Sequence, residues 1–232
     1  MLLAMKKILQ ALGITKRKSA STETLHNPYS SHETNFMYNL LFCDTPGLFH
    51  VSEDSSSEDW HIALFVDQDP SRIRAIAVNE KTESRIRLLA YNWLRKNNQS
   101  VPKANLMGVV VEVPLESGLD TLAAYLDGRI RYINQTGKMT IVEEGYSNLN
   151  SLAIELVKLA SPILAKIGPW DNERLAAPEA GSIRLTFLAS DGLYFGEGPF
   201  QALQQDPLAG PIVDKAVELL QTVVNESIEP RT

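Results

Sequence analysis

The amino-acid sequence predicts an α+β protein with a mixed, mainly antiparallel sheet and helices packed on one face. Three observations support this fold class. Three short strand patterns joined by tight turns follow one another from residue 121 to residue 143, which indicates an antiparallel meander. Residues 148–167 and the region after residue 206 carry apolar residues at helical spacing and can cover such a sheet. The chain has 232 residues, enough to bury a core without disulfide or metal cross-links.

The first half of the chain contains five segments of distinct character. Residues 35–43 are apolar and aromatic, and we expect a short buried helix there. Residues 52–59 are acidic and rich in serine, which is typical of a solvated loop. Residues 61–66 form a short apolar run, which we interpret as a buried strand. Residues 82–97 place their apolar side chains on one helical face, and residues 106–113 are β-branched and apolar, as expected of a central strand.

The second half begins with the meander. Its predicted strands are residues 121–126, 129–134 and 138–143. Asp127-Gly128 and Thr136-Gly137 supply the two turns, because glycine accepts the backbone conformations that tight turns require. A long helix at residues 148–167 follows, and Pro162 is expected to split it near Leu159.

A second hairpin and a last helix complete the chain. Residues 182–189 and 193–195 are predicted to be strands joined by Asp191-Gly192. The last helix is expected to begin at Asp206-Pro207 or at Gly210-Pro211, since proline suits the first helical position.

The predicted domain organisation is simple. Residues 1–34 are expected to be a basic N-terminal segment with a polar linker, and residues 35–232 a single α+β domain. Residues 1–20 carry five lysines and arginines and no acid. This segment is either a basic amphipathic anchor for a membrane surface or acidic partner, or a terminal helix that docks or frays; we favour the second. Its apolar residues precede the first lysines, the reverse of the order in a secretory signal.

Composition, charge and absent motifs exclude several kinds of chemistry. The single cysteine, Cys43, excludes an internal disulfide and a multi-cysteine metal site. The net charge of −6 argues against a surface devoted to nucleic acid. No apolar run is long enough for a transmembrane helix, and we expect a cytoplasmic location. The sequence contains no P-loop, no dinucleotide-binding glycine pattern, no nucleophile elbow and no His-Glu-x-x-His motif, so no cofactor is predicted.

Three groups of polar residues have both a functional and a structural interpretation. The four histidines lie close to Cys43 and Asp44 in sequence, but their spacing matches no metal-binding pattern, so no metal site is predicted. Glu143 and Glu144 are adjacent and should point to opposite faces of a strand, which favours a solvated strand end over a catalytic pair. The basic stretch at residues 72–96 is interpreted as the exterior of a helix, since its Trp93 falls on the apolar stripe. The four histidines are His26, His32, His50 and His61.

The densest local signal is the glycine-rich aromatic stretch around residues 191–200. Tyr194, Phe195 and Phe200 are candidates to line a pocket or interface, with Glu197 as its polar group. The same residues are equally consistent with a hairpin that attaches the last helix to the sheet, and we favour that interpretation.

The same stretch carries a resemblance to known sequences. The segment Asp191-Gly-Leu-Tyr-Phe-Gly-Glu-Gly-Pro-Phe200, followed by Asp206-Pro-Leu-Ala-Gly-Pro211, resembles the C-terminal signature of a family of uncharacterised bacterial proteins. The resemblance covers about the last forty residues. That family has no assigned activity, so the resemblance implies a bacterial cytosolic protein and no catalytic residue.

Two hypotheses about function follow from these observations. The first is a non-catalytic binding or regulatory module whose sheet offers a pocket or an oligomer interface. Its partner would be a second copy of the chain, another protein or a small ligand. The second is a small-molecule enzyme that uses carboxylates near Tyr194 and Glu197, or a histidine-based metal site near His61. The missing catalytic motifs and the aromatic hairpin favour the first hypothesis.

Overall fold

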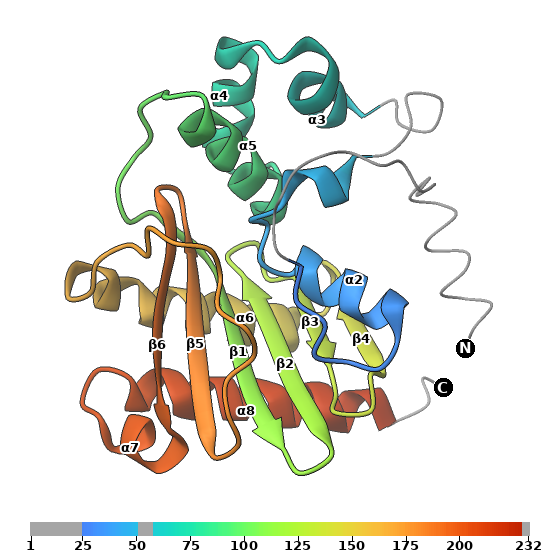
Figure 1. Cartoon of the computed structure of the whole chain (residues 1–232), viewed down its shortest axis with the longest axis vertical. Helices are drawn as coiled ribbons and strands as arrows, with labels where there is room; N and C mark the ends of the chain where they lie inside the picture. The colour runs from blue at the N-terminus through green and yellow to red at the C-terminus, as the bar shows by residue number, and fades with distance from the viewer. Residues whose placement is uncertain (1–24, 51–57, 229–232) are drawn as a thin grey trace.

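The centre of the molecule is a six-stranded sheet with the strand order β4-β3-β2-β1-β5-β6 (Figure 1). The structure, a computed structural model, describes residues 25–50 and 58–228. The strands are β1 (Leu106–Leu115), β2 (Gly118–Tyr125), β3 (Ile130–Ile133), β4 (Met139–Val142), β5 (Ser182–Ala189) and β6 (Gly192–Pro199). Every pairing between these strands is antiparallel. The α+β class is therefore confirmed, with a sheet that is antiparallel throughout its described strands rather than mixed.

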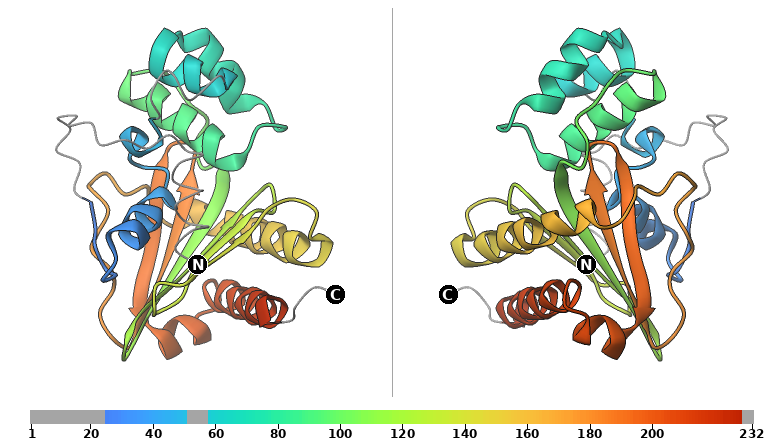
Figure 2. Two further views of the ribbon diagram at one scale, coloured as in Figure 1. Left: turned by 90° about the vertical axis from the view of Figure 1, so that its right-hand side faces the viewer. Right: turned by 90° about the vertical axis from the view of Figure 1, so that its left-hand side faces the viewer.

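Helices cover both faces of this sheet, where the sequence led us to expect one covered face. Figure 2 shows the sheet edge-on, with α6 and α8 on one side, α2 on the other, and α3 to α5 at one end. The helices are α2 (His32–Leu40), α3 (Asp59–Ile62), α4 (Pro70–Val78), α5 (Ser84–Lys96), α6 (Ser147–Ala160), α7 (Phe200–Gln205) and α8 (Gly210–Ile228). The sheet carries a helical layer on each face because β1 is buried on both of its faces from Leu106 to Glu112. We call the two sides the α8 face and the α2 face.

Each face has its own apolar core. On the α8 face, the core joins strand residues such as Val109 and Val111 to residues of α6 and α8 such as Leu156 and Leu219. On the α2 face, a second core joins Met107 and Tyr125 to residues of α2, α4 and α5. The helices of the first half of the chain thus supply the second layer.

The predicted meander is present as β2, β3 and β4. Gly128 and Gly137 both adopt positive φ angles, of 88° and 79°, at the two turns between these strands. A side chain at either position would be strained there, which explains the glycines of the Asp-Gly and Thr-Gly turns. The helices predicted at residues 35–43 and 82–97 correspond to α2 and α5.

The strand predicted at residues 61–66 is wrong. These residues belong to α3 and to a π-helical turn, η3 (Ala63–Asp67), which ends at Gln68 in the left-handed conformation. Ala63 and Leu64 are buried in the core of the α2 face. A short apolar run is compatible with a buried strand and with a buried helix, and periodicity alone does not separate them.

The C-terminal half follows the prediction closely. Pro162 ends the regular part of the long helix, because the chain continues after α6 as a 3₁₀ turn, η4 (Ser161–Ala165). Helix α8 begins at Gly210 and has Pro211 in its first turn. A short 3₁₀ turn, η1 (Pro46–Phe49), precedes α3. No helix within residues 25–50 and 58–228 is both long enough and apolar enough to cross a membrane.

The predicted basic segment and most of the predicted acidic loop lie outside the described residues, which begin at Leu25 and omit residues 51–57. The residues before α2 lie against the sheet. Tyr29 is buried, and its hydroxyl group is 2.8 Å from the hydroxyl oxygen of Thr121 on β2. This part of the predicted linker is therefore packed on the α2 face.

Candidate interaction surface

The four predicted hairpin residues are divided between the two faces of the sheet. Tyr194 lies in the core of the α8 face, and its hydroxyl donates a hydrogen bond of 2.9 Å to Asp191. Phe200 begins α7 and lines a small cavity beneath α8. Phe195 and Glu197 alternate with Tyr194 along β6 and therefore lie on the α2 face. Their role in binding a ligand or partner stays a prediction, but the four do not meet in one pocket.

Burial and hydrogen bonding fix the protonation of Tyr194. Burial of its ring and the bond to Asp191 raise the pKa of the Tyr194 hydroxyl to about 12. The phenol is therefore neutral at physiological pH and acts as a hydrogen-bond donor.

Glu197 is part of an ion pair that crosses from β6 to β5. The Arg184 Nε and Nη2 atoms lie 2.7 and 2.6 Å from one carboxylate oxygen of Glu197. The Nη1 atom of the same arginine donates to the carbonyl oxygen of Ala176 at 2.6 Å. Only 5% of the Arg184 side chain is exposed, whereas 28% of the Glu197 side chain is, so the arginine is the member of the pair that is removed from water. Glu197 therefore neutralises a buried cation.

A buried acid lies next to this ion pair. Glu112 on β1 is fully buried, accepts a hydrogen bond of 2.6 Å from the Tyr38 hydroxyl and lies 3.7 Å from Arg184. Burial raises the pKa of the Glu112 carboxyl, whereas the Tyr38 bond and the nearby arginines oppose that rise. The sequence shows this acid only as one charge inside an apolar strand, and its partners come from distant segments.

Arg174 ties the N-terminal part of the chain to the same region. Its Nε atom donates to Asp44 at 2.9 Å and its Nη2 atom to Asn39 at 2.7 Å. Its guanidinium group lies 3.9 Å from the centre of the Phe42 ring. The buried charges around Glu112, Arg174 and Arg184 thus join α2, the residues before β5 and the sheet. Their protein partners satisfy most of their hydrogen-bonding groups, as in a structural cluster.

The histidines and the cysteine are not assembled into a site. His26 Nε2 is 2.8 Å from the carbonyl oxygen of Arg174, and the rings of His50 and His61 pack against Phe65. Burial raises the pKa of the Cys43 thiol, which makes it a poor nucleophile. In the described part of the chain, no three histidine, cysteine or acidic side chains are grouped so that they could hold a metal ion.

The sheet has two edges, and the edge at β6 is covered by another segment at Leu193, whereas no backbone partner within the described residues reaches the outward groups of Phe195 and Glu197. The backbone N–H of Trp170 donates to the carbonyl oxygen of Leu193 at 2.7 Å, and the two residues form an isolated antiparallel bridge. The Trp170 ring also packs edge-on against Phe195, with 4.9 Å between ring centres. At the far end of the strand, Pro199 has no N–H to offer. These features are the usual protection of an edge strand against a second strand.

The edge at β4 is open. The backbone N–H of Asn134 donates to the carbonyl oxygen of Lys138 at 2.9 Å, so the backbone groups of Lys138 face β3. Because these groups alternate along a strand, those of Thr140 also face β3, whereas those of Met139 and Ile141 face away from the sheet. No other residue within the described ranges hydrogen-bonds to these outward groups of Met139 and Ile141.

The side chains of β4 offer none of the usual protection. The strand reads Met-Thr-Ile-Val and contains no charge, glycine or proline, and its register with β3 has no bulge. Ile141 is 37% exposed and shares the α2 face with Met139, whereas Thr140 shares the α8 face with Val142. Apart from the shortness of this four-residue strand, the apolar edge has no protection of these kinds, and it is a template for pairing with another strand.

Opposite charges stand at the two ends of β4. Lys138 precedes the strand and is exposed, with no ion-pair partner among the described residues. Glu143 and Glu144 follow the strand and are both exposed, as the sequence predicted for this strand end. Arg129 lies 2.8 Å from each of these carboxylates and holds them at that end.

The basic stretch at residues 72–96 is largely engaged within the protein. Arg72 bonds to Asp59 and Asp67, and Arg87 is buried with its Nε atom 3.0 Å from the carbonyl oxygen of Ala77.

No protein-family model matches the sequence of this chain, and no curated protein matches it.

Proposed function

We propose that this protein is a non-catalytic interaction module that associates with a second copy of itself through β4. One observation carries the proposal: the outward N–H and C=O groups of Met139 and Ile141 form an unpaired ladder on an apolar, unprotected edge. Pairing this edge with the same edge of a second copy extends the sheet across a two-fold axis. Closed, two-fold association is the commonest form of self-assembly.

The edge is complementary to itself about Thr140. With the two-fold axis at Thr140, Met139 of one copy lies opposite Ile141 of the other. Both are positions whose backbone groups face outward, so each such pair exchanges its two backbone hydrogen bonds. All outward groups of the strand find partners in this register.

The side chains fit the same register. On the α2 face, Met139 and Ile141 of both copies form a continuous apolar cluster that covers the exposed part of Ile141. On the α8 face, the two Thr140 side chains lie opposite one another, a pairing that is favourable between antiparallel strands. Lys138 of each copy lies at the end of the other copy that carries Glu143 and Glu144. The charges at the ends therefore favour antiparallel pairing.

Sedimentation equilibrium of the purified chain tests this proposal. The expected result for the natural sequence is a dimer. Ile141→Lys places a charge at the centre of the interface and is expected to weaken association at least a hundredfold, leaving a folded monomer. Leu115→Lys is the matched control, because Leu115 is a similarly exposed apolar residue at 41% exposure and lies in the turn region of β1.

Two results would overturn the proposal. One is a natural chain that remains a monomer at the highest soluble concentration. The other is a dimer that Ile141→Lys leaves intact, which would move the interface to another surface of the molecule.

A further inference from the structure

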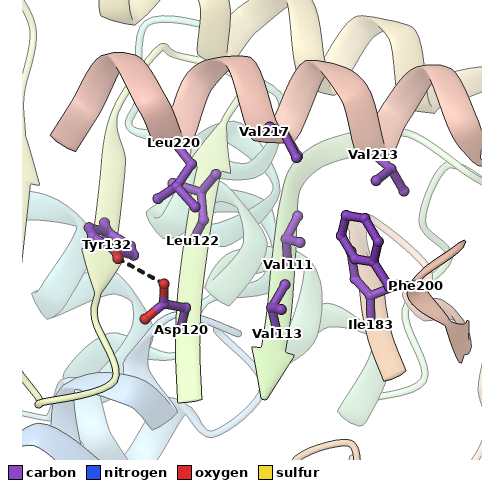
Figure 3. A pocket seen from close by; sticks show the side chains of 11 residues that line it. Val111, Val113, Asp120, Leu122, Tyr132, Ile183, Phe200, Val213, Val217 and Leu220 are labelled. Carbon is purple, nitrogen blue, oxygen red and sulfur yellow. Dashed lines mark hydrogen bonds between the residues drawn. The ribbon is translucent and has the colours of Figure 1, made fainter. Parts of the chain in front are cut away.

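A small cavity lies between α8 and the α8 face of the sheet, about 30 Å³ in volume (Figure 3). Its walls are mostly aliphatic side chains of β1, β2, β5 and α8, and the rings of Tyr132 and Phe200 complete the lining. The side chains that face one another across it are Val111, Val113, Leu122, Val213, Val217 and Leu220. An apolar lining of this kind favours an apolar group over water.

One carboxylate stands at the rim of this apolar cavity. Asp120 on β2 accepts hydrogen bonds from the Tyr132 hydroxyl at 3.0 Å and from the backbone N–H of Gln135 at 2.6 Å. Burial and the nearby Asp120 charge raise the pKa of the Tyr132 hydroxyl, so that group stays a neutral donor. The side chain of Asp120 is thereby held in a fixed position beside the cavity, as Figure 3 shows.

The charge of Asp120 has no cationic partner. Among the described residues, no lysine, arginine or histidine lies within ion-pair distance of its carboxylate. Lys215 on α8 is bonded instead to Glu155 at 3.2 Å and to Glu218 at 2.7 Å. A carboxylate beside an apolar cavity, without a cation of its own, favours a ligand that brings a positive charge on an apolar body.

We propose that this cavity is a binding site for a small aliphatic ammonium ion. The alkyl end enters the space between Val217 of α8 and Leu122 of β2, and the ammonium group bonds to Asp120. The volume is about two to three times the minimum that a cavity needs to hold one water molecule, so the site takes the end of a short chain rather than a bulky ring. A carboxylate ligand of the same length is excluded, because Asp120 would repel it.

Methyl-resolved NMR with n-propylammonium chloride as the probe tests the site. We expect saturable shifts of the methyl signals of Val111, Leu122 and Leu220, and none with propionate. Asp120→Asn keeps the size of the side chain and removes its charge. This variant is expected to weaken propylammonium binding at least tenfold, and to weaken binding of the neutral analogue n-propanol much less, because the alcohol loses only a charge-assisted hydrogen bond.

A second variant tests the cavity independently of the charge. Ala216 lines the cavity, and Ala216→Val fills part of it, so this variant is expected to weaken both probes alike. The proposal is overturned if propylammonium causes no saturable shift of these methyl signals, or if Asp120→Asn binds it as tightly as the natural chain does.

Discussion

The two edges of the sheet differ in how they are protected. Along β6, a neighbouring segment bridges Leu193, Glu197 is bound to a buried arginine, and Pro199 ends the strand without an N–H. Along β4, the outward backbone groups of Met139 and Ile141 have no partner in the described part of the chain, and the side chains carry no charge. Proteins normally protect both edges of an open sheet. If β4 binds a second copy as we propose, changes at β4 should affect association and changes at β6 should affect folding.

Proline substitutions along β4 should give the largest effects. Thr140→Pro removes an N–H that belongs to the ladder with β3 and leaves its acceptor unpaired, and we expect it to destabilise the fold by about 1–3 kcal/mol. Ile141→Pro removes an N–H that faces away from the sheet, so the stability of the monomer should change little while association is lost. Urea denaturation and sedimentation measure the two effects separately. Equal loss of stability in both variants would show that the backbone N–H of Ile141 does not face away from the sheet.

A substitution on β6 should lower the stability of the fold and leave the association of two copies unchanged. Glu197→Gln removes the charge that neutralises Arg184, whose side chain is 5% exposed. We expect a loss of about 2 kcal/mol in the free energy of unfolding, and an unchanged dissociation constant. Urea denaturation of the variant provides the first value and sedimentation the second. A dimer weakened by this substitution would assign the interface to β6 instead.

The charges at the ends of β4 should make a smaller contribution. Lys138→Glu places an acid near Glu143 and Glu144 of the second copy, and we expect the dissociation constant to rise about threefold to fivefold. The double variant Lys138→Glu with Glu144→Lys should recover most of the affinity. Because exposed charges are screened by salt, both effects should shrink at high ionic strength. A double variant as weak as the single one would argue against this register.

The smallest expected effect concerns a residue outside β4, in the segment before α2. Burial, together with the charge of Arg174, lowers the pKa of His26 below its usual 6.5. The unfolded chain therefore takes up a proton before the folded protein does, and stability should fall as the pH drops from about 6.5 toward the lowered pKa. Above this window both states are neutral and the effect is absent. His26→Gln should flatten this part of the stability profile, measured by urea denaturation at several pH values; an unchanged profile would contradict the assignment.

The sequence alone predicted the local elements well. The Asp127-Gly128 and Thr136-Gly137 turns determine the meander, because each turn fixes the pairing of its two neighbouring strands. Residues 61–66 were assigned wrongly, since a short apolar run suits a helix as well as a strand. The second helical layer was also missed, because its cause, burial of β1 on both faces, involves helices distant in sequence.

The sequence could not predict that β4 is an open edge, because the position of a strand in the sheet also depends on segments distant in sequence. The segment Lys-Met-Thr-Ile-Val-Glu predicts a strand, but only the strand order shows that β4 has a neighbour on one side alone. The division of Tyr194 and Phe195 between two faces, by contrast, follows from the alternation of any strand. The partners of Glu112 come from α2 and β5, and no local pattern identifies them.

A disulfide cross-link at the proposed two-fold axis tests the account most directly. In the proposed register, the two Thr140 residues form a non-hydrogen-bonded pair with Cα atoms about 4.5 Å apart, which a disulfide can bridge. Thr140→Cys should therefore form a covalent dimer under mild oxidation, since the natural Cys43 is buried. Gly196→Cys is the matched control on β6, where an added Cβ meets open space. A covalent dimer of the first variant alone is the predicted result; no cross-link at residue 140, or equal cross-linking at residue 196, would contradict pairing through β4.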